Sequence, residues 1–221
     1  MPHFTHHYEE NYLKALYKLS NKELEKVNNI ALAKHMELNP ATVLEMVRKM
    51  VEKGLVQLLP DKSIQLTEKG KKNAILIIRK HRLWEVFLVD KLNYKWNEVH
   101  ELAEQLEHIE SNNLIDRLEK FLGYPVCDPH GDPIPDKNGK IKSNISVPLS
   151  SVLQGKSYII TNFGDTKDSF LEYLEKNNLK PGSKIKLIEQ NEYDKSTTIS
   201  INKKTINVSE KVAQNLLVRP I

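Results

Sequence analysis

The chain of 221 residues contains a single cysteine, Cys127, so it cannot form an intrachain disulfide. This is consistent with a reducing cytoplasm. No apolar run approaches the roughly 20 residues that a membrane-spanning helix needs. The N-terminal segment MPHFTHHYEENY has no basic stretch followed by an apolar core, so a secretory signal is not expected. We therefore expect a cytoplasmic protein that has no association with a membrane.

Neither sign of charge dominates the sequence. Lysine and arginine number 33 and aspartate and glutamate 29, which gives a net charge of +4. Such a charge permits nucleic-acid binding without requiring it. Hydrophobic residues at 39% and charged residues at 28% indicate a globular protein, and the length suits one large domain or two to three small ones.

The N-terminal third combines helical and extended patterns. Helices are predicted over residues 9–19, 30–36 and 41–53, and short strands over residues 55–59 and 63–67. Asn39 offers an N-cap and Pro40 a first helical residue for the third helix, which ends before Gly54. Three helices followed by a β-hairpin is the order of elements in a winged helix-turn-helix.

The third helix is the predicted DNA-reading helix, because the second helix of a helix-turn-helix enters the major groove. Val43, Val47 and Met50 have the spacing of its packed side. Base or phosphate contacts are expected from the polar side and its surroundings, namely Lys34, Asn39, Ala41, Thr42, Glu45, Arg48, Lys49 and Lys62. The alternatives are a winged helix that is used only for protein contacts, or charges that merely form a solvated face.

The remaining sequence changes character twice. A long helix is predicted over residues 68–91 and one or two helices over 96–121. The segment CDPHGDPIPDKNGK is too rich in proline, glycine and aspartate for a regular element. After it come β-like runs at residues 157–161, 184–189, 197–201 and 204–208, and a helix at 168–177. We expect a small β-barrel-like domain there.

Histidine and glutamate recur at helical spacing in the middle of the chain. His81 and Glu85 are four residues apart, and a second helical face is formed by His100, Glu104, Glu107 and His108. Divalent metals take nitrogen and oxygen ligands of this kind. The plainer interpretation is an ordinary solvated helix face. However, apolar neighbours such as Leu102 and Leu106 bring this face close to a core, where unneutralised charges are costly.

The order of these features resembles the DtxR/MntR family of metal-dependent transcriptional repressors. The resemblance rests on a winged helix, RKHRLWE, VHELAEQLEH, a PHGDPIP loop and a C-terminal β-domain. It implies an α+β fold: a winged helix-turn-helix over residues 1–73, a helical dimerisation and metal-binding domain over 74–140, and an SH3-like (FeoA-like) domain over 141–221. It also implies a homodimer that binds palindromic operators of metal-uptake genes when it is loaded with metal.

The resemblance also implies metal ligands. The family's primary site falls on Asn11, His81, Glu104, Glu107 and His108. Asn11 departs from the usual Met or Asp, and Lys14 stands where some manganese-type members have a second N-terminal carboxylate. Glutamate at position 104, where iron-type members have cysteine, favours Mn²⁺, with Fe²⁺ as the alternative.

A second metal site and a switch are implied as well. The candidate residues for the second site are Glu85, His100, Cys127, His130 and Asp165. In the primary site we expect Glu104 and Glu107 to repel each other without metal, which would loosen the N-terminal helix. A divalent cation would remove this repulsion and favour the DNA-binding state.

Two other classes of function remain as alternatives. One is a metal-independent winged-helix regulator whose β-domain binds a small molecule or a peptide. The other is an enzyme, but the sequence has neither an HExxH motif nor a recognisable nucleophile motif. We therefore expect a DNA-binding protein that is not an enzyme and has no small-molecule substrate.

Overall fold

The computed structural model describes residues 3–23, 26–141 and 146–221. The described chain forms two compact units. The first contains the residues up to His81 together with Glu104–Asp116 and Pro135–Lys140, and the second contains Arg82–Ala103, Arg117–Ile134 and Ile141–Ile221. Residues 142–145, which follow the segment that was predicted to be irregular, lie outside the described residues.

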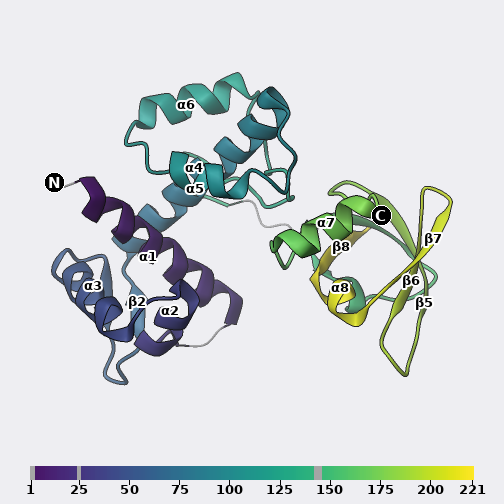
Figure 1. Ribbon diagram of the computed structural model, residues 1–221, viewed down its shortest axis with the longest axis horizontal. Coiled ribbons are helices and arrows are strands. Elements are labelled where there is room, and N and C mark those ends of the chain that lie inside the picture. Colours follow the sequence, from purple (N-terminus) through teal and green to yellow (C-terminus); the bar gives the residue numbers. More distant parts are fainter. Residues whose placement is uncertain (1–2, 24–25, 142–145) are drawn as a thin grey trace. The chain divides into compact units, whose positions relative to one another are not determined.

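The first unit contains the expected winged helix. Its elements are α1 (His3–Glu23), α2 (Asn29–Met36), α3 (Pro40–Glu52), β1 (Val56–Leu58), β2 (Ile64–Leu66) and the beginning of α4 (Glu68–Leu92). Helix α1 is longer than predicted and runs alongside α2 and β2 (Figure 1). Asn39 caps α3 as expected, since its side chain accepts a hydrogen bond of 2.8 Å from the amide of Ala41.

The core of the first unit lies between α1 and the helix-turn-helix. One buried cluster joins Tyr12, Leu13 and Leu16 of α1 to Val43 and Val47 of α3. Burial of such side chains contributes about 1.5–3 kcal/mol each. Helix α1 and α3, the helix that is predicted to read DNA, therefore share one core.

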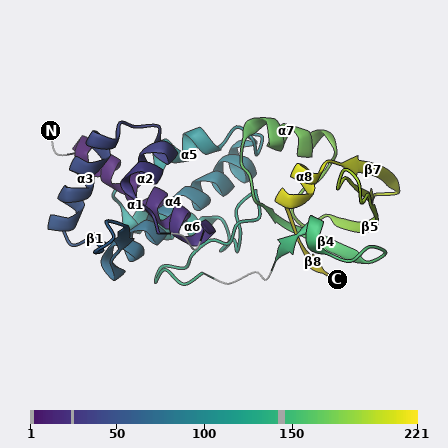
Figure 2. The same ribbon diagram turned by 90° about the horizontal axis from the view of Figure 1, so that it is seen from below.

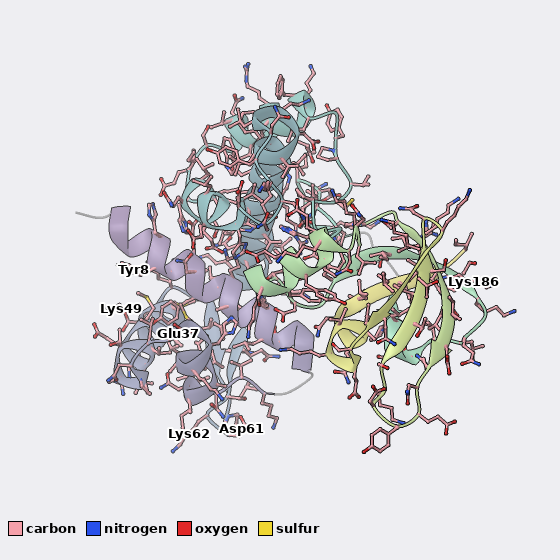
Figure 3. The ribbon with its side chains drawn as sticks, turned by 45° about the vertical axis from the view of Figure 1, so that its right-hand side comes forward. Tyr8, Glu37, Lys49, Asp61, Lys62 and Lys186 are labelled. Atoms are coloured by element: carbon pink, nitrogen blue, oxygen red, sulfur yellow. The ribbon has the colours of Figure 1, made fainter. Side chains whose placement is uncertain are left out.

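The β-hairpin forms the wing. Strands β1 and β2 pair antiparallel with Val56 opposite Leu66, and the turn between them places Lys62 in a left-handed conformation with φ of 65°. Lys62 and Asp61 project from the tip of the hairpin (Figure 3). At the hairpin's base, Gly70 of α4 packs so close to the carbonyl of Leu55 that a Cβ would lie 2.0 Å from its oxygen.

Three helices contribute residues to both units. They are α4, α5 (His100–Leu106) and α6 (Asn112–Phe121). The expected single helical face from His100 to His108 is interrupted, because α5 ends at Leu106 and Glu107 and His108 lie in the following turn. None of the described helices is both long and apolar enough to cross a membrane.

The C-terminal part of the second unit is a β-domain. Its elements are β3 (Val147–Pro148), a 3₁₀ turn (Leu149–Ser151), β4 (Ser157–Phe163), α7 (Asp168–Lys176), β5 (Lys184–Gln190), β6 (Thr197–Ile201), β7 (Lys204–Val208), α8 (Glu210–Asn215) and β8 (Leu216–Pro220). Among the described residues the strands form one antiparallel sheet in the order β3-β8-β4-β5-β6-β7. Figure 2 shows β4, β5, β7 and β8 with α8 beside them.

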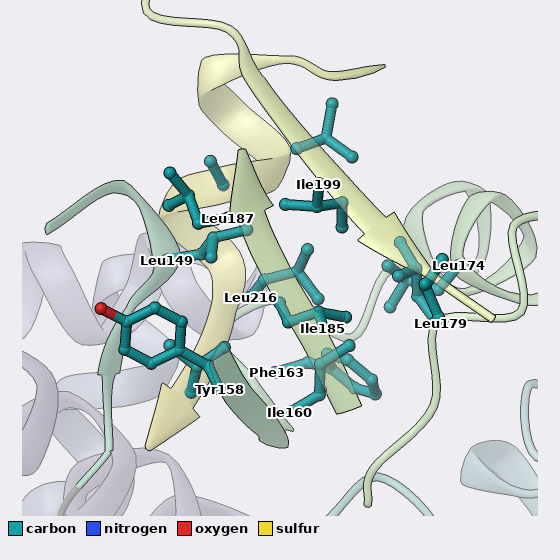
Figure 4. Packing of buried hydrophobic residues seen from close by; sticks show 14 of the residues in the cluster. Leu149, Tyr158, Ile160, Phe163, Leu174, Leu179, Ile185, Leu187, Ile199 and Leu216 are labelled. Carbon is teal, nitrogen blue, oxygen red and sulfur yellow. The ribbon is translucent and has the colours of Figure 1, made fainter. Parts of the chain in front are cut away.

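Strand β8 was missed by the sequence analysis although it lies inside the sheet, between β3 and β4. Bulges near Asn162 in β4 and near Glu189 in β5 shift the register and bend the sheet. The bent sheet and α7 enclose an apolar core that includes Ile160, Leu187 and Leu216 (Figure 4).

Candidate metal centre

One face of α1 presents the polar side chains of the candidate primary site. His7, Glu10, Asn11 and Lys14 have the spacing i, i+3, i+4 and i+7, which places them on one side of a helix. The buried residues Tyr12, Leu13 and Leu16 occupy the opposite side. Helix α1 thus packs on the helix-turn-helix with one face and presents polar groups with the other.

Glu107 lies at the centre of this site with a fully buried side chain. Its Oε2 atom lies 2.5 Å from Nδ1 of His81. The Nζ atom of Lys14 lies 2.6 Å from Oε1 and 2.9 Å from Oε2 of Glu107, and 2.5 Å from Oε1 of Glu104. A buried carboxylate requires such partners, because removal from water destabilises an unpaired charge.

His108 belongs to the same site. Its Nδ1 donates to Oε2 of Glu10 at 2.6 Å, since a carboxylate can only accept. The ring of His7 stacks on the ring of His108 with centroids 4.5 Å apart. Lys80 of α4 lies 3.7 Å from Oε1 of Glu10. Glu10 was not singled out from the sequence, yet it is the buried carboxylate that α1 contributes to this site.

Asn11 provides a test of whether these residues fit a cation. Its Oδ1 atom is buried and has no hydrogen-bond partner among the described residues. A buried oxygen without a partner costs about 1–3 kcal/mol. A hollow of about 360 Å³ adjoins it, lined by His7, Tyr8, Asn11, Glu104, Gln105 and His108. A carboxylate, two imidazoles and an unsatisfied amide oxygen around one hollow fit a divalent cation such as Mn²⁺ or Fe²⁺.

The structure brings all five predicted primary-site residues into this region of the first unit. His81 lies next to Glu107 and within 4.0 Å of Glu104, while Asn11, Glu104 and His108 line the same hollow. The expected repulsion between Glu104 and Glu107 is offset, because the ammonium group of Lys14 lies between them. Lys14 and Glu10 therefore tie α1 to α5 and its following turn in this structure.

A second cluster lies in the second unit and is fully buried. Glu85, Asp128 and His130 place ligand atoms within 4.8 Å of one another. Glu85 lies 3.7 Å from Nδ1 of His130 and 3.5 Å from Nδ1 of His100. Asp128, which lies in the segment that was predicted to be irregular, supplies a carboxylate to this cluster.

Burial and neighbouring charges in this cluster favour the protonated forms of Asp128 and His130. Burial raises the pKa of Asp128 to about 7, and the charges of Glu85 and Asp132 act in the same direction. Burial by itself lowers the pKa of His130, but its contact with Glu85 and the charge of Asp128 outweigh this effect, so that its pKa is raised. A crowded acidic site of this kind favours the entry of a cation.

The other two predicted residues of the second site lie outside this cluster. Cys127 pairs with Pro133 in an isolated β-bridge, and burial raises the pKa of its thiol, with Asp128 and Asp132 adding to the shift. Asp165 accepts a hydrogen bond of 3.1 Å from the amide of Lys167 at the start of α7. Among the described residues, the cluster therefore consists of nitrogen and oxygen donors.

The predicted DNA-contacting residues lie on the surface of the first unit. Val43, Val47 and Met50 are buried, as the spacing indicated. The residues that are predicted to contact DNA are all exposed, namely Lys34, Asn39, Ala41, Thr42, Glu45, Arg48, Lys49 and Lys62. Glu45 and Lys49 form an ion pair of 2.8 Å on the outer face of α3, where Figure 3 labels Lys49.

Known proteins share the fold and the domain order of this chain. Three domain-family models cover the chain: the iron-dependent repressor N-terminal DNA-binding domain over residues 4–64, the iron-dependent repressor metal-binding and dimerisation domain over 67–136, and the FeoA domain over 147–220. A solved manganese-dependent transcriptional repressor in complex with manganese is 30% identical, with a TM-score of 0.87 over 96% of this chain and 100% of that one.

The chain belongs to the DtxR/MntR family of metal-dependent transcriptional repressors. The diphtheria toxin repressor of Corynebacterium diphtheriae is 28% identical over 96% of both chains. The iron-dependent repressor IdeR of Mycobacterium tuberculosis is 37% identical over 57% of this chain, a region that spans only about half (54%) of the IdeR length.

Membership of the DtxR/MntR family confirms the predicted fold class, with helical DNA-binding and dimerisation parts and a C-terminal FeoA-like β-sheet domain. Members of this family are transcriptional repressors and not enzymes. The names of the relatives mention both iron and manganese, so they support a divalent metal without selecting one.

Three residues of these sites were missed or underrated by sequence reasoning. Glu10 and Lys14 share a helical face with Asn11, and this spacing was the available signal. Asp128 gave no such signal, because its position depends on the fold of the loop. Its Oδ1 accepts hydrogen bonds from the amides of His130 and Asp132, and Arg82 approaches its Oδ2 at 3.4 Å.

Proposed function

We propose that this protein is a repressor whose winged helix binds palindromic operators of metal-uptake genes when a divalent cation occupies the site around Glu107. Mn²⁺ is the expected ion, because the donors are carboxylates, imidazoles and an amide without a thiolate, and Fe²⁺ is the alternative. The observation that supports this most directly is that α1 contributes both to the core of the helix-turn-helix and to the ligand cluster.

The ligands of this primary site are Asn11, His81, Glu104, Glu107 and His108, joined by Glu10. A bound cation would neutralise the carboxylates and satisfy the amide oxygen of Asn11. It would thereby fix the position of α1, and with it the DNA-reading helix α3. The cation shifts the population towards the DNA-binding state only by its higher affinity for that state.

We further propose that the protein acts as a homodimer, in the layout of a winged helix over residues 1–73, a metal-binding and dimerisation part over 74–140 and a β-domain over 141–221. The three matching family models support this division. Exposed apolar side chains in the second unit offer a surface for a second copy, including Leu92 at 51%, Phe121 at 63% and Val126 at 67%. Two-fold symmetry matches a palindromic operator.

Glu85, Asp128 and His130 are proposed as a second cation site, with His100 close to Glu85. Its three donors are buried, so an ion there would stabilise the loop around His130. Cys127 and Asp165 remain candidates from the family resemblance, but the structure supports Asp128 as the third donor.

A titration of DNA binding against metal tests the primary site. Double-stranded DNA would first be selected from a random-sequence library with Mn²⁺-loaded protein. Fluorescence anisotropy would then measure its affinity with a chelator, Mn²⁺, Zn²⁺ or, anaerobically, Fe²⁺. We expect binding to require a divalent ion and to be lost in His108→Ala. The control Glu101→Gln, an exposed carboxylate of α5, should behave like the wild type.

The titration also separates the alternatives. Affinity that is unchanged by the chelator would favour the metal-independent regulator. Metal-dependent binding that persists in His108→Ala would refute the primary-site assignment.

A further inference from the structure

The ammonium group of Lys14 lies between the two carboxylates that are proposed to hold the metal. Its Nζ atom is 2.5 Å from Oε1 of Glu104 and 2.6 Å from Oε1 of Glu107, with Oε2 of Glu107 at 2.9 Å. The Lys14 side chain is 19% exposed and that of Glu107 is fully buried. A positively charged group of the chain itself therefore bridges these carboxylates.

Lys14 and a divalent cation would use the same oxygens. Both oxygens of Glu107 contact Lys14, and Oε2 also contacts His81. A metal ion that is coordinated by Glu104 and Glu107 would lie about 2 Å from those oxygens. The ammonium and the ion would then repel each other at close range, most strongly at the fully buried carboxylate of Glu107, because water screens buried charges less.

We propose that Lys14 is an internal competitor for the metal, and that it sets the metal concentration at which this protein is loaded. The proposal rests on the proposed function, since it requires the cluster around Glu107 to bind the cation. The metal must displace the ammonium from Glu104 and Glu107. The free energy of those two ion pairs therefore opposes binding, and the metal affinity is lower than the donor set alone would give.

Direct titration with MnCl₂ by isothermal calorimetry tests this without any DNA. Lys14→Met removes the charge and keeps most of the apolar stem, while Lys14→Arg is the matched variant that retains the charge. We expect Lys14→Met to bind Mn²⁺ about tenfold more tightly or better than wild type, a change of the size seen when groups around a metal site are altered. Lys14→Arg should remain close to wild type.

Thermal unfolding supplies a second measurement. Without metal, Lys14→Met leaves Glu107 buried with one partner fewer, so its Tm should fall. The rise in Tm on adding MnCl₂ should then exceed that of wild type, because tighter binding stabilises the folded state further. Lys14→Gln, which can still donate a hydrogen bond to Glu107, takes the place of Lys14→Met if the latter does not fold without metal.

The outcomes separate this inference from the proposed function. The proposed metal site fails if Mn²⁺ does not bind, or if its binding to wild type and to Lys14→Met is unchanged when His108→Ala is added. If wild type binds through His108 and Lys14→Met or Lys14→Gln binds equally or more weakly, Lys14 supports the ligands instead, and the competitor proposal is overturned.

Discussion

His130 donates its Nε2 hydrogen to the backbone carbonyl of Trp96 across 2.9 Å. Because a carbonyl can only accept, this bond fixes the proton on Nε2 and directs Nδ1 towards Glu85. The ring of Trp96 packs against Phe163 in the core of the β-domain, with centroids 5.6 Å apart. The β-domain core therefore holds the imidazole in the orientation that a metal ligand needs.

The first prediction is that Asp128, and not Cys127, is a metal ligand of the second site. In a His108→Ala background, which disables the primary site, we expect one Mn²⁺ to bind per subunit. Adding Asp128→Asn should abolish that binding, whereas adding Cys127→Ser should preserve it. The raised pKa of the Cys127 thiol keeps it protonated, and a metal takes the thiolate. Calorimetric stoichiometry measures this, and loss of binding in the Cys127→Ser protein instead would contradict it.

The same aspartate predicts a pH dependence of stability. The pKa of Asp128 is raised to about 7, mainly by burial and by Glu85, so its charged form is disfavoured in the folded state. Its contribution to stability is complete at low pH and is lost as the pH rises towards and through 7. His130, whose pKa is also raised, acts in the same direction.

Asp128→Asn removes this titration and keeps the Oδ1 acceptor for the amides of His130 and Asp132. Relative to wild type, its metal-free Tm should be higher by a few degrees at pH 8.5, and this difference should shrink as the pH falls below 7 towards the ordinary aspartate pKa near 4, since ~1 kcal/mol shifts Tm by about 2–4 °C at this chain length. Thermal unfolding across that pH range measures the difference. A constant offset between the two proteins would show that the charge of Asp128 is not the cause.

Local signals predicted much of this fold. Asn39 and Pro40 marked the start of α3, and Pro60-Asp61-Lys62 marked the wing, because capping and turn formation depend on neighbouring residues. Strand β8 was missed because α8 ends directly where it begins, and its place in the sheet comes from pairing with β4, far away in the sequence. The role of Asp128 likewise depends on Arg82 and Glu85, which no local pattern connects to it.

Gly131 is required where the loop after Asp128 meets strand β4. Its φ is 86°, and a Cβ would lie 1.9 Å from the carbonyl oxygen of Thr161. Gly131→Ala should therefore lower the free energy of unfolding by at least about 2 kcal/mol, through backbone strain and a clash with backbone that cannot easily move. Denaturant unfolding measures the loss.

Gly155 provides the matched control for that substitution. Its φ is 78°, but a Cβ there would have no atom within 4 Å, so Gly155→Ala introduces the strain without the clash. We expect a clearly smaller loss of stability for Gly155→Ala. Equal losses in the two variants would mean that the close approach to Thr161 contributes nothing.

The exposed face of α3 predicts which substitutions alter DNA recognition. Thr42 and Arg48 are exposed, while Val43 and Val47 hold the helix in the core from its other side. Replacing a residue that reads a base should cost about 1–3 kcal/mol of binding and relax specificity at one position of the site. We expect this of Thr42→Ala and Arg48→Ala. Lys62→Ala at the wing tip should weaken all sequences alike and reduce the salt dependence, as loss of a phosphate contact does.

Anisotropy titrations of the Mn²⁺-loaded proteins at several salt concentrations, on the selected DNA and on single-base variants of it, distinguish these effects. Lys203→Ala, an exposed lysine between β6 and β7, controls for the loss of one positive charge and should leave affinity unchanged. Because neither Thr42 nor Arg48 is buried, we expect each variant to have the thermal stability of wild type. If both α3 variants bound the selected DNA with wild-type affinity and specificity, α3 would not be the helix that reads the operator.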